Sequence, residues 1–185
     1  MMIRNLCLAG GLVMVAAVLT LAAGDRDSGT PEPATIDGFG RVTAFPDAAA
    51  QPRHGSKLLV DMTGGGPPDE LSSTADKLAR FINIYGAAGK EPAGVRITVV
   101  LHGDATYLAL NDKAWAEKYG AARNPNLPLF RKLRETGVEL LVCGQSLTRK
   151  GFEPAQTDKS VELAVSGLTA LVNYQQDGYA FIPLR

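Results

Sequence analysis

Three short apolar runs constrain the fold of this chain more than any other feature of its sequence. They cover residues 57–62, 95–101 and 138–142, and the second run is especially rich in β-branched residues. Segments with helical periodicity separate them. Apolar strands that alternate with helices are typical of a parallel sheet with helices on both faces, which predicts an α/β fold.

The segment after the first run has a helix pattern. From about residue 69, apolar side chains recur at steps of four and three, which lines one face of a helix: Leu71, Ala75, Leu78, Ile82 and Tyr85. We expect Gly86 and Gly89 to end this helix, and two further helices over about residues 112–119 and 127–136.

The last third of the chain admits two interpretations. Residues 161–165 are either a fourth strand or the first turns of a helix that continues through Val172. Ser166 is a good N-cap, so we favour a strand followed by a helix that ends at Gly178. The last strand then covers residues 179–182, and Pro183, which cannot donate to a strand ladder, places it at a sheet edge.

The first 24 residues have the layout of a secretory signal peptide. Arg4 precedes an apolar run, and small residues up to Gly24 offer a cleavage site. The alternative is a membrane anchor, because the run approaches the roughly 20 residues that span a bilayer. No cluster of lysine or arginine follows to stop transfer. We expect cleavage, a mature chain that begins near Asp25, and a periplasmic or secreted protein with no membrane attachment.

Residues 25–56 are rich in proline and glycine and lack apolar periodicity, which is typical of a linker or a loosely packed arm. Phe39, Val42 and Phe45 are candidates to dock this arm on the domain, in one short strand. The predicted organisation is therefore a leader (1–24), an arm (25–56) and one α/β domain (57–185).

The charge balance argues against two classes of function. The chain has 19 basic and 19 acidic side chains, a formal net charge of zero. A protein that binds nucleic acid needs a basic stripe that displaces counterions from phosphates. A protein that binds membrane surfaces through charge needs a polybasic segment. We expect neither nucleic acid nor a membrane surface as a partner.

Three loops with unusual residues follow the predicted strands, at residues 63–68, 102–106 and 143–146. In an open parallel sheet, ligands gather beyond the carboxyl ends of the strands. The glycines of the first loop match no phosphate-binding motif, so we interpret them as a tight turn with backbone angles that other residues resist. Metal ligands are few, because the mature chain has one cysteine and two histidines, with His54 in the arm. We expect no metal and no cofactor.

Cys143 is the candidate reactive residue, since Cys7 leaves with the leader. Five residues of a buried type precede Cys143, which favours an inert core cysteine. However, Gly144 and Ser146 place it at a strand-to-helix turn, where a helix N-terminus lowers the pKa of a thiol. His102 ends another strand of the same sheet and is the second candidate, because it could give the thiolate a hydrogen bond or a charge.

The residues around both candidates resemble a known family. Three pieces carry the likeness to the DsrE/DsrF-like family of sulfur-relay proteins: His102-Gly103, the sequence GVELLVCGQS at 137–146, and GYAFI at 178–182. The resemblance covers residues 57–185. It implies a three-layer α/β/α fold with a five-stranded parallel sheet in the order 4-3-2-1-5. Neighbouring second and third strands would bring His102 within reach of Cys143.

The resemblance also implies a function. Active members carry sulfur as a persulfide on one cysteine, whose position Cys143 matches, and members form homo- or hetero-oligomers. We therefore expect an exported homo-oligomer in which Cys143 accepts sulfane sulfur from a donor and passes it to the thiol of a partner protein. Two alternatives stay open: a non-catalytic binding or assembly module with Cys143 buried, and a thiol redox sensor.

Overall fold

A computed structural model describes residues 36–88 and 95–185. The predicted leader, the first part of the arm (25–35) and Gly89 lie outside the described residues. Within the described ranges, no helix is both long and apolar enough to cross a bilayer.

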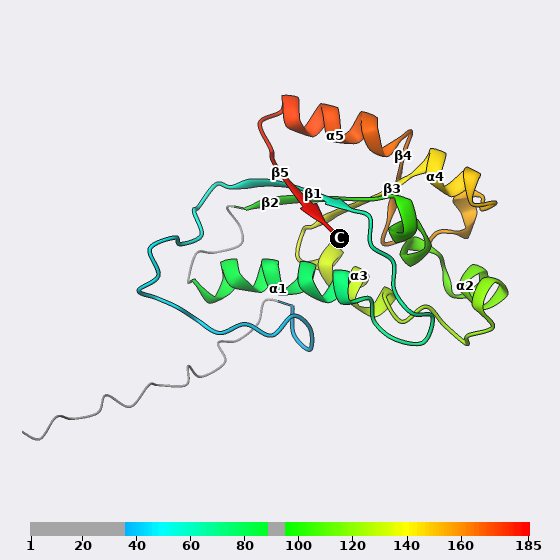
Figure 1. Ribbon diagram of the computed structural model, residues 1–185, viewed down its shortest axis with the longest axis horizontal. Coiled ribbons are helices and arrows are strands. Elements are labelled where there is room, and N and C mark those ends of the chain that lie inside the picture. Colours follow the sequence, from blue (N-terminus) through cyan, green and yellow to red (C-terminus); the bar gives the residue numbers. More distant parts are fainter. Residues whose placement is uncertain (1–35, 89–94) are drawn as a thin grey trace, which may run out of the picture.

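Five parallel strands form one sheet (Figure 1). They are β1 (Lys57–Met62), β2 (Arg96–Leu101), β3 (Glu139–Cys143), β4 (Glu162–Ala164) and β5 (Ala180–Leu184). Their order, β4-β3-β2-β1-β5, is the order that the family resemblance implied. The last strand lies at an edge, as Pro183 predicted.

Helices lie on both faces of this sheet, which confirms the α/β/α fold. In Figure 1, α1 and α3 lie below the sheet and α5 lies above it. The helices are α1 (Ser73–Ala87), α2 (Asp112–Tyr119), α3 (Leu127–Glu135), α4 (Gly144–Arg149) and α5 (Gly167–Gln176), with short 3₁₀ segments η2 (Gly103–Ala109) and η3 (Pro154–Gln156).

The two faces of the sheet are buried unequally. The face toward α1 and α3 holds the larger hydrophobic core. On the opposite face, α5 packs on one residue from each of three neighbouring strands, Leu59, Val100 and Leu141. Because side chains alternate along a strand, the residues two positions further along each strand also face α5.

Ser166 caps α5 as predicted. Its Oγ accepts a hydrogen bond from the Thr169 N–H, with 3.0 Å between the two atoms. β4 precedes this cap, and Gly178 follows the helix with a left-handed φ of 84°. The interpretation as a strand followed by a helix is confirmed, and the continuous helix is wrong.

α1 differs from its prediction at both ends. It begins at Ser73 rather than near residue 69, because the loop before it is held outside the helix. The Ser72 N–H donates to Asn126 Oδ1 (2.9 Å), and the Ser72 hydroxyl donates to the Gly65 carbonyl (2.7 Å). Gly86 lies inside α1, whose last residue is Ala87, so it does not end the helix as predicted.

The glycine loop after β1 is tight for a reason other than the predicted one. Gly64, Gly65 and Gly66 all have negative φ, so the expectation of unusual backbone angles is wrong. Instead, a Cβ at Gly66 would lie 2.8 Å from the Ser72 side chain, and one at Gly64 would lie 2.6 Å from Thr74 Oγ1. Close packing against the start of α1 therefore requires glycine here.

Part of the arm is fastened to α1 by one buried side chain. Asn83 accepts a hydrogen bond from the Ile36 N–H (2.7 Å) and donates to the carbonyls of Phe39 (2.9 Å) and Gly40 (3.0 Å). Ile36 is buried in the main core. The arm therefore packs on the domain at its residues 36–40.

The rest of the described arm differs from the expectation. Residues 36–56 contain no strand, because their backbone follows α1 rather than a sheet edge. Of the three docking candidates, Phe39 and Val42 are half-buried, whereas Phe45 is exposed.

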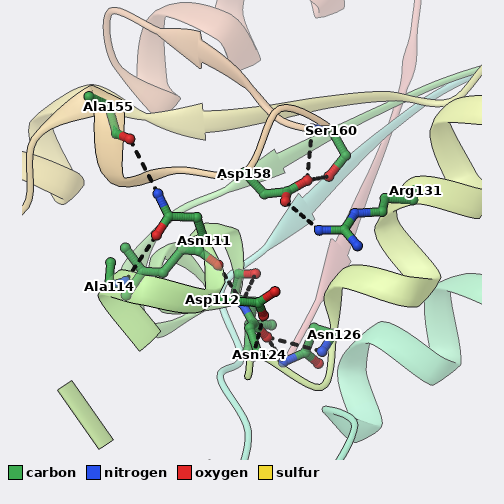
Figure 2. Close-up of polar contacts among 11 residues, drawn as sticks. Asn111, Asp112, Ala114, Asn124, Asn126, Arg131, Ala155, Asp158 and Ser160 are labelled. Atoms are coloured by element: carbon green, nitrogen blue, oxygen red, sulfur yellow. Dashed lines mark hydrogen bonds and ion pairs between the residues drawn. The ribbon is translucent and has the colours of Figure 1, made fainter. Parts of the chain in front are cut away.

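Two buried asparagines position the segment that follows β2 (Figure 2). Asn124 donates to the carbonyls of Leu108 and Leu110, at 2.9 and 2.7 Å. Asn126 donates to Asn124 Oδ1 (2.9 Å), and its own Oδ1 accepts the hydrogen bond from the Ser72 N–H. The network ties η2, which directly follows His102, to the loops before α1 and α3.

Thr106 provides a test of the packing in η2. Within the described residues, its Oγ1 is the one buried side-chain nitrogen or oxygen without a hydrogen-bond partner. Thr106→Val should raise the free energy of unfolding by about 1 kcal/mol, because it removes an unpaired buried hydroxyl. Urea denaturation measures this change. As a control, Thr98→Val should lower the free energy of unfolding, because the Thr98 hydroxyl donates a hydrogen bond to Glu139 Oε2 that valine cannot make. A loss of stability in the Thr106 variant would contradict the account.

Candidate functional site

Three polar side chains gather at the carboxyl end of the sheet, on the face that α5 covers. Asp61, His102 and Cys143 each stand two positions beyond a residue on which α5 packs. β2 and β3 pair Leu101 with Val142, so His102 and Cys143 are the next residues of neighbouring strands. The structure thus brings the two predicted site residues together and adds Asp61.

Cys143 ends β3 and is the N-cap of α4. Its Sγ accepts a hydrogen bond from the Ser146 N–H at 3.3 Å. Burial opposes ionisation of the thiol, but hydrogen bonds from the Ser146 hydroxyl and from the N–H groups of Gly167, Ser146 and Gln145 outweigh it. The pKa of Cys143 therefore lies below its ordinary value.

The N-terminus of α5 reaches the same sulfur. Gly167, the first residue of α5, lies against Cys143, and its backbone N–H lowers the pKa of the thiol. A Cβ added at Gly167 would lie 3.5 Å from the side chains of both Cys143 and His102, so Gly167 lies between them. α4 and α5 therefore both direct the positive ends of their dipoles toward one thiol, which favours the thiolate.

His102 is paired with Asp61 rather than with the thiol. Its Nε2 is hydrogen-bonded to Asp61 Oδ1, and Asp61 is buried. Because an ionised carboxylate only accepts, this pairing assigns the hydrogen to Nε2, and in a neutral ring Nδ1 is then the acceptor. Among the described residues, no hydrogen bond joins His102 to Cys143. His102 is thus a neighbour of the thiol that is oriented by a carboxylate.

Gly103 allows the sharp turn that follows His102. Its φ of 55° lies in the left-handed region, which strains residues with a side chain. A Cβ there would also lie 3.4 Å from the Thr63 carbonyl oxygen. The His-Gly sequence therefore ends β2 abruptly and leaves the imidazole at the carboxyl edge of the sheet.

The thiol is shielded from solvent, whereas the imidazole is more open. Cys143 is 6% exposed, and the His102 side chain is 26% exposed. A shielded nucleophile with a low pKa favours small sulfur species over bulky reagents. The site has the elements of thiol exchange: a stabilised thiolate, surrounding N–H donors and an oriented proton acceptor.

Sequence reasoning missed three contributors to this site. The sequence contains a signal for Asp61: it is a charged residue within an apolar strand, and such a residue rarely stays buried without a partner. The signal for Gly167 is weaker: it directly follows the Ser166 cap and is therefore the first residue of the predicted helix. The sequence indicates Ser146 only as a marker of the turn, whereas its N–H donates to the sulfur and its hydroxyl lowers the pKa of the thiol.

A cavity lined by charged side chains lies away from the thiol, between α3 and residues 154–161, with a volume of about 800 Å³. Its arginines are already paired. Arg131 binds Asp158 at 2.8 Å (Figure 2), and Arg134 binds Glu162 at 2.6 Å. Within residues 36–88 and 95–185, no group of three or more His, Cys, Asp or Glu side chains is placed to hold a metal ion. Cys143 therefore stays the centre of the candidate site.

Comparison with known proteins identifies the family. The family model described as DsrE/DsrF-like matches residues 57–184, which include Asp61, His102 and Cys143. The chain belongs to the DsrE/DsrF-like family. The DsrE/DsrF-like family is of the sulfur-relay type, and the match confirms the resemblance found in the sequence.

The DsrE/DsrF-like domain also has solved structural relatives. A protein of unknown function from Methanobacterium thermoautotrophicum matches 69% of this chain and 98% of its own, with 17% sequence identity and a TM-score of 0.48. No curated protein matches this chain.

Proposed function

We propose that this DsrE-like domain carries sulfane sulfur on Cys143. The supporting observation is the convergence of two helix N-termini, those of α4 and α5, on one thiol with a lowered pKa. The thiolate is the form of cysteine that attacks sulfur, and a thiolate of low pKa also leaves readily. A carrier needs both properties, because it must take up sulfur and release it.

Uptake and release are two exchange steps. The Cys143 thiolate attacks the outer sulfur of a donor persulfide or polysulfide, a new S–S bond forms on Sγ, and the donor leaves as its own thiolate. A partner thiolate then attacks that outer sulfur, the S–S bond on Sγ breaks, and Cys143 leaves as a thiolate. The electrons balance without an external oxidant or reductant, because the sulfane sulfur keeps its oxidation state.

In this proposal, His102 is the residue that accepts and donates protons. With Asp61 holding Nε2, Nδ1 is the acceptor of the neutral ring, so the imidazole can take the proton of the Cys143 thiol before the attack and give it to the leaving thiolate of the donor. Asp61 acts through His102 as a positioning residue.

We also propose that the carrier works outside the cytoplasm. The support is the leader-like sequence of residues 1–24. N-terminal sequencing of the exported protein should find a chain that begins near Asp25. Full-length protein confined to the membrane fraction would indicate an anchor instead.

Mass spectrometry of the folded protein separates this function from its alternatives. After exposure to polysulfide, the peptide that contains Cys143 should gain the mass of one sulfur atom and lose it when a thiol acceptor is added. Cys143→Ser should gain none. A gain of oxygen after mild peroxide, with no gain of sulfur, would favour a redox sensor. No change with either reagent would favour a non-catalytic module.

A further inference from the structure

α5 contacts both ends of β3, the strand that carries the thiol. Gly167, at the start of the helix, lies against Cys143 at the carboxyl end of the strand. Tyr174, near the other end of the helix, donates its hydroxyl to Glu139 at the beginning of the strand. The two contacts are seven positions apart on α5 and four positions apart on β3, or about 10 Å of helix and about 13 Å of strand. α5 therefore runs antiparallel to β3 and spans it.

The other contacts of α5 with the sheet do not fix its position along the strand. Apart from its first residue, α5 buries Ala170 and Leu171, which pack on apolar side chains of three strands. Hydrophobic contact is non-directional, so it resists a small shift along the helix axis only weakly. Beyond the end of α5, Lys57 Nζ donates to the Asp177 carbonyl at 3.0 Å, but this contact is exposed to competing water.

The contact between Tyr174 and Glu139 is better suited to fix the helix. Glu139 Oε2 also accepts a hydrogen bond from the buried Thr98 hydroxyl at 2.9 Å, so the carboxylate is held on the sheet by the neighbouring strand. The Tyr174 ring packs edge-on against Tyr179, with the ring centroids 5.0 Å apart. Hydrogen bonds to an ionised acceptor are stronger than neutral ones. Burial and the Glu139 carboxylate raise the pKa of Tyr174, so its hydroxyl stays a donor at neutral pH.

We propose that Tyr174 and Glu139 are positioning residues for the thiol. Their hydrogen bond sets where α5 lies along β3, and this holds the Gly167 N–H against the sulfur of Cys143. Both residues act from the far end of the strand, through the helix. A small shift of α5 would weaken the contact of the N–H with the sulfur, because hydrogen bonds weaken steeply with distance and angle. These roles rest on the proposed function, since a positioned thiolate matters only if Cys143 exchanges sulfur.

The pH profile of Cys143 alkylation in the folded full chain tests this positioning. Tyr174→Phe keeps the ring and removes the hydroxyl. Its midpoint should rise by about half a unit, which leaves about threefold less thiolate below the midpoint. The Gly167 amide hydrogen, followed by NMR, should exchange with solvent faster in this variant. Tyr179→Phe is the matched control, because it removes a hydroxyl from the adjacent ring and leaves the bond to Glu139 in place, so both measurements should match the wild type.

Glu139→Gln separates position from charge. The amide oxygen can still accept from Tyr174, so the midpoint should stay at the wild-type value. A carboxylate that acted on the thiol through its charge would, once neutralised, shift the midpoint downward. A shift in Glu139→Gln as large as that expected for Tyr174→Phe would therefore overturn the proposal. So would a folded Tyr174→Phe with the wild-type midpoint, or an equal rise in Tyr179→Phe.

Circular dichroism checks that each variant folds. If Tyr174→Phe does not, Thr98→Val replaces it, because it loosens the same carboxylate and should raise the midpoint by a smaller amount; no rise there would also contradict the proposal. Sulfur loading of Cys143 from polysulfide is measured on the same samples. A wild type that loads sulfur, with an unchanged midpoint in Tyr174→Phe, contradicts the positioning alone. A raised midpoint in Tyr174→Phe, with a wild type that loads no sulfur, contradicts the carrier function alone.

Discussion

Asn83→Ala should lower the free energy of unfolding by about 3 kcal/mol, because one side chain satisfies several buried backbone groups of the arm. It accepts from the Ile36 N–H and donates to the carbonyls of Phe39 and Gly40. Without the amide, these groups either stay buried and unpaired or the arm leaves α1 and exposes Ile36 to water. Both outcomes cost stability.

Urea denaturation measures this loss, and limited proteolysis within residues 41–56 should become faster in the same variant. Lys77→Ala is the control, because Lys77 is an exposed residue of α1 and should change stability by less than about 0.5 kcal/mol. If Asn83→Ala is as stable as the control, the arm contributes nothing to the fold, and its contacts with α1 are incidental.

Ser146→Ala should slow the alkylation of native Cys143 several-fold at neutral pH. The Ser146 hydroxyl is the largest of the contributions that lower the pKa of Cys143. Its loss raises that pKa, so less thiolate is present at neutral pH and the rate falls. The rate is followed against pH with a small alkylating reagent, and Cys143 is read at the peptide level. Thr148→Ala removes an exposed hydroxyl from the same helix and should leave the profile unchanged.

The same thiol makes stability depend on pH. The pKa of Cys143 is lower in the folded chain than in the unfolded chain, so folding is favoured by ionisation of the thiol. This contribution is fully present above the unfolded pKa and is lost as the pH falls through the folded pKa. The free energy of unfolding should rise with pH between those two values, and Cys143→Ser should remove that rise. An identical pH dependence in both proteins would show that the thiol is not stabilised as an anion.

The sequence predicted the elements of the fold better than their contacts. Apolar runs and the Ser166 cap identify strands and a helix from local residues alone, and these predictions were confirmed. The start of α1 could not be found this way, because Asn126 holds Ser72 from 54 positions away. The prediction for the glycine loop was wrong for a similar reason, because the space at Gly64 and Gly66 is limited by the side chains of Thr74 and Ser72, which no local pattern places there.

The candidate site shows the same division. Its position at a strand-to-helix turn follows from Cys143-Gly144 and the residues before them. The pairing of His102 with Asp61 depends on the register of β1 and β2, which no local pattern gives. Nor does the sequence show that Gly167 lies against Cys143. The two residues are 24 positions apart, and only the packing of α5 on the sheet brings them together.

The reactivity of Cys143 in the folded protein, compared with the denatured protein, tests the proposed sulfur carrier most directly. A thiol that exchanges sulfur must be reached while the chain is folded, although Cys143 is only 6% exposed. We predict that a small thiol reagent labels Cys143 in the native protein at neutral pH, and that the native rate exceeds the denatured rate at mildly acidic pH, because the folded thiol has the lower pKa. If Cys143 is labelled only after denaturation, it is a buried core residue, and the proposed sulfur carrier is wrong.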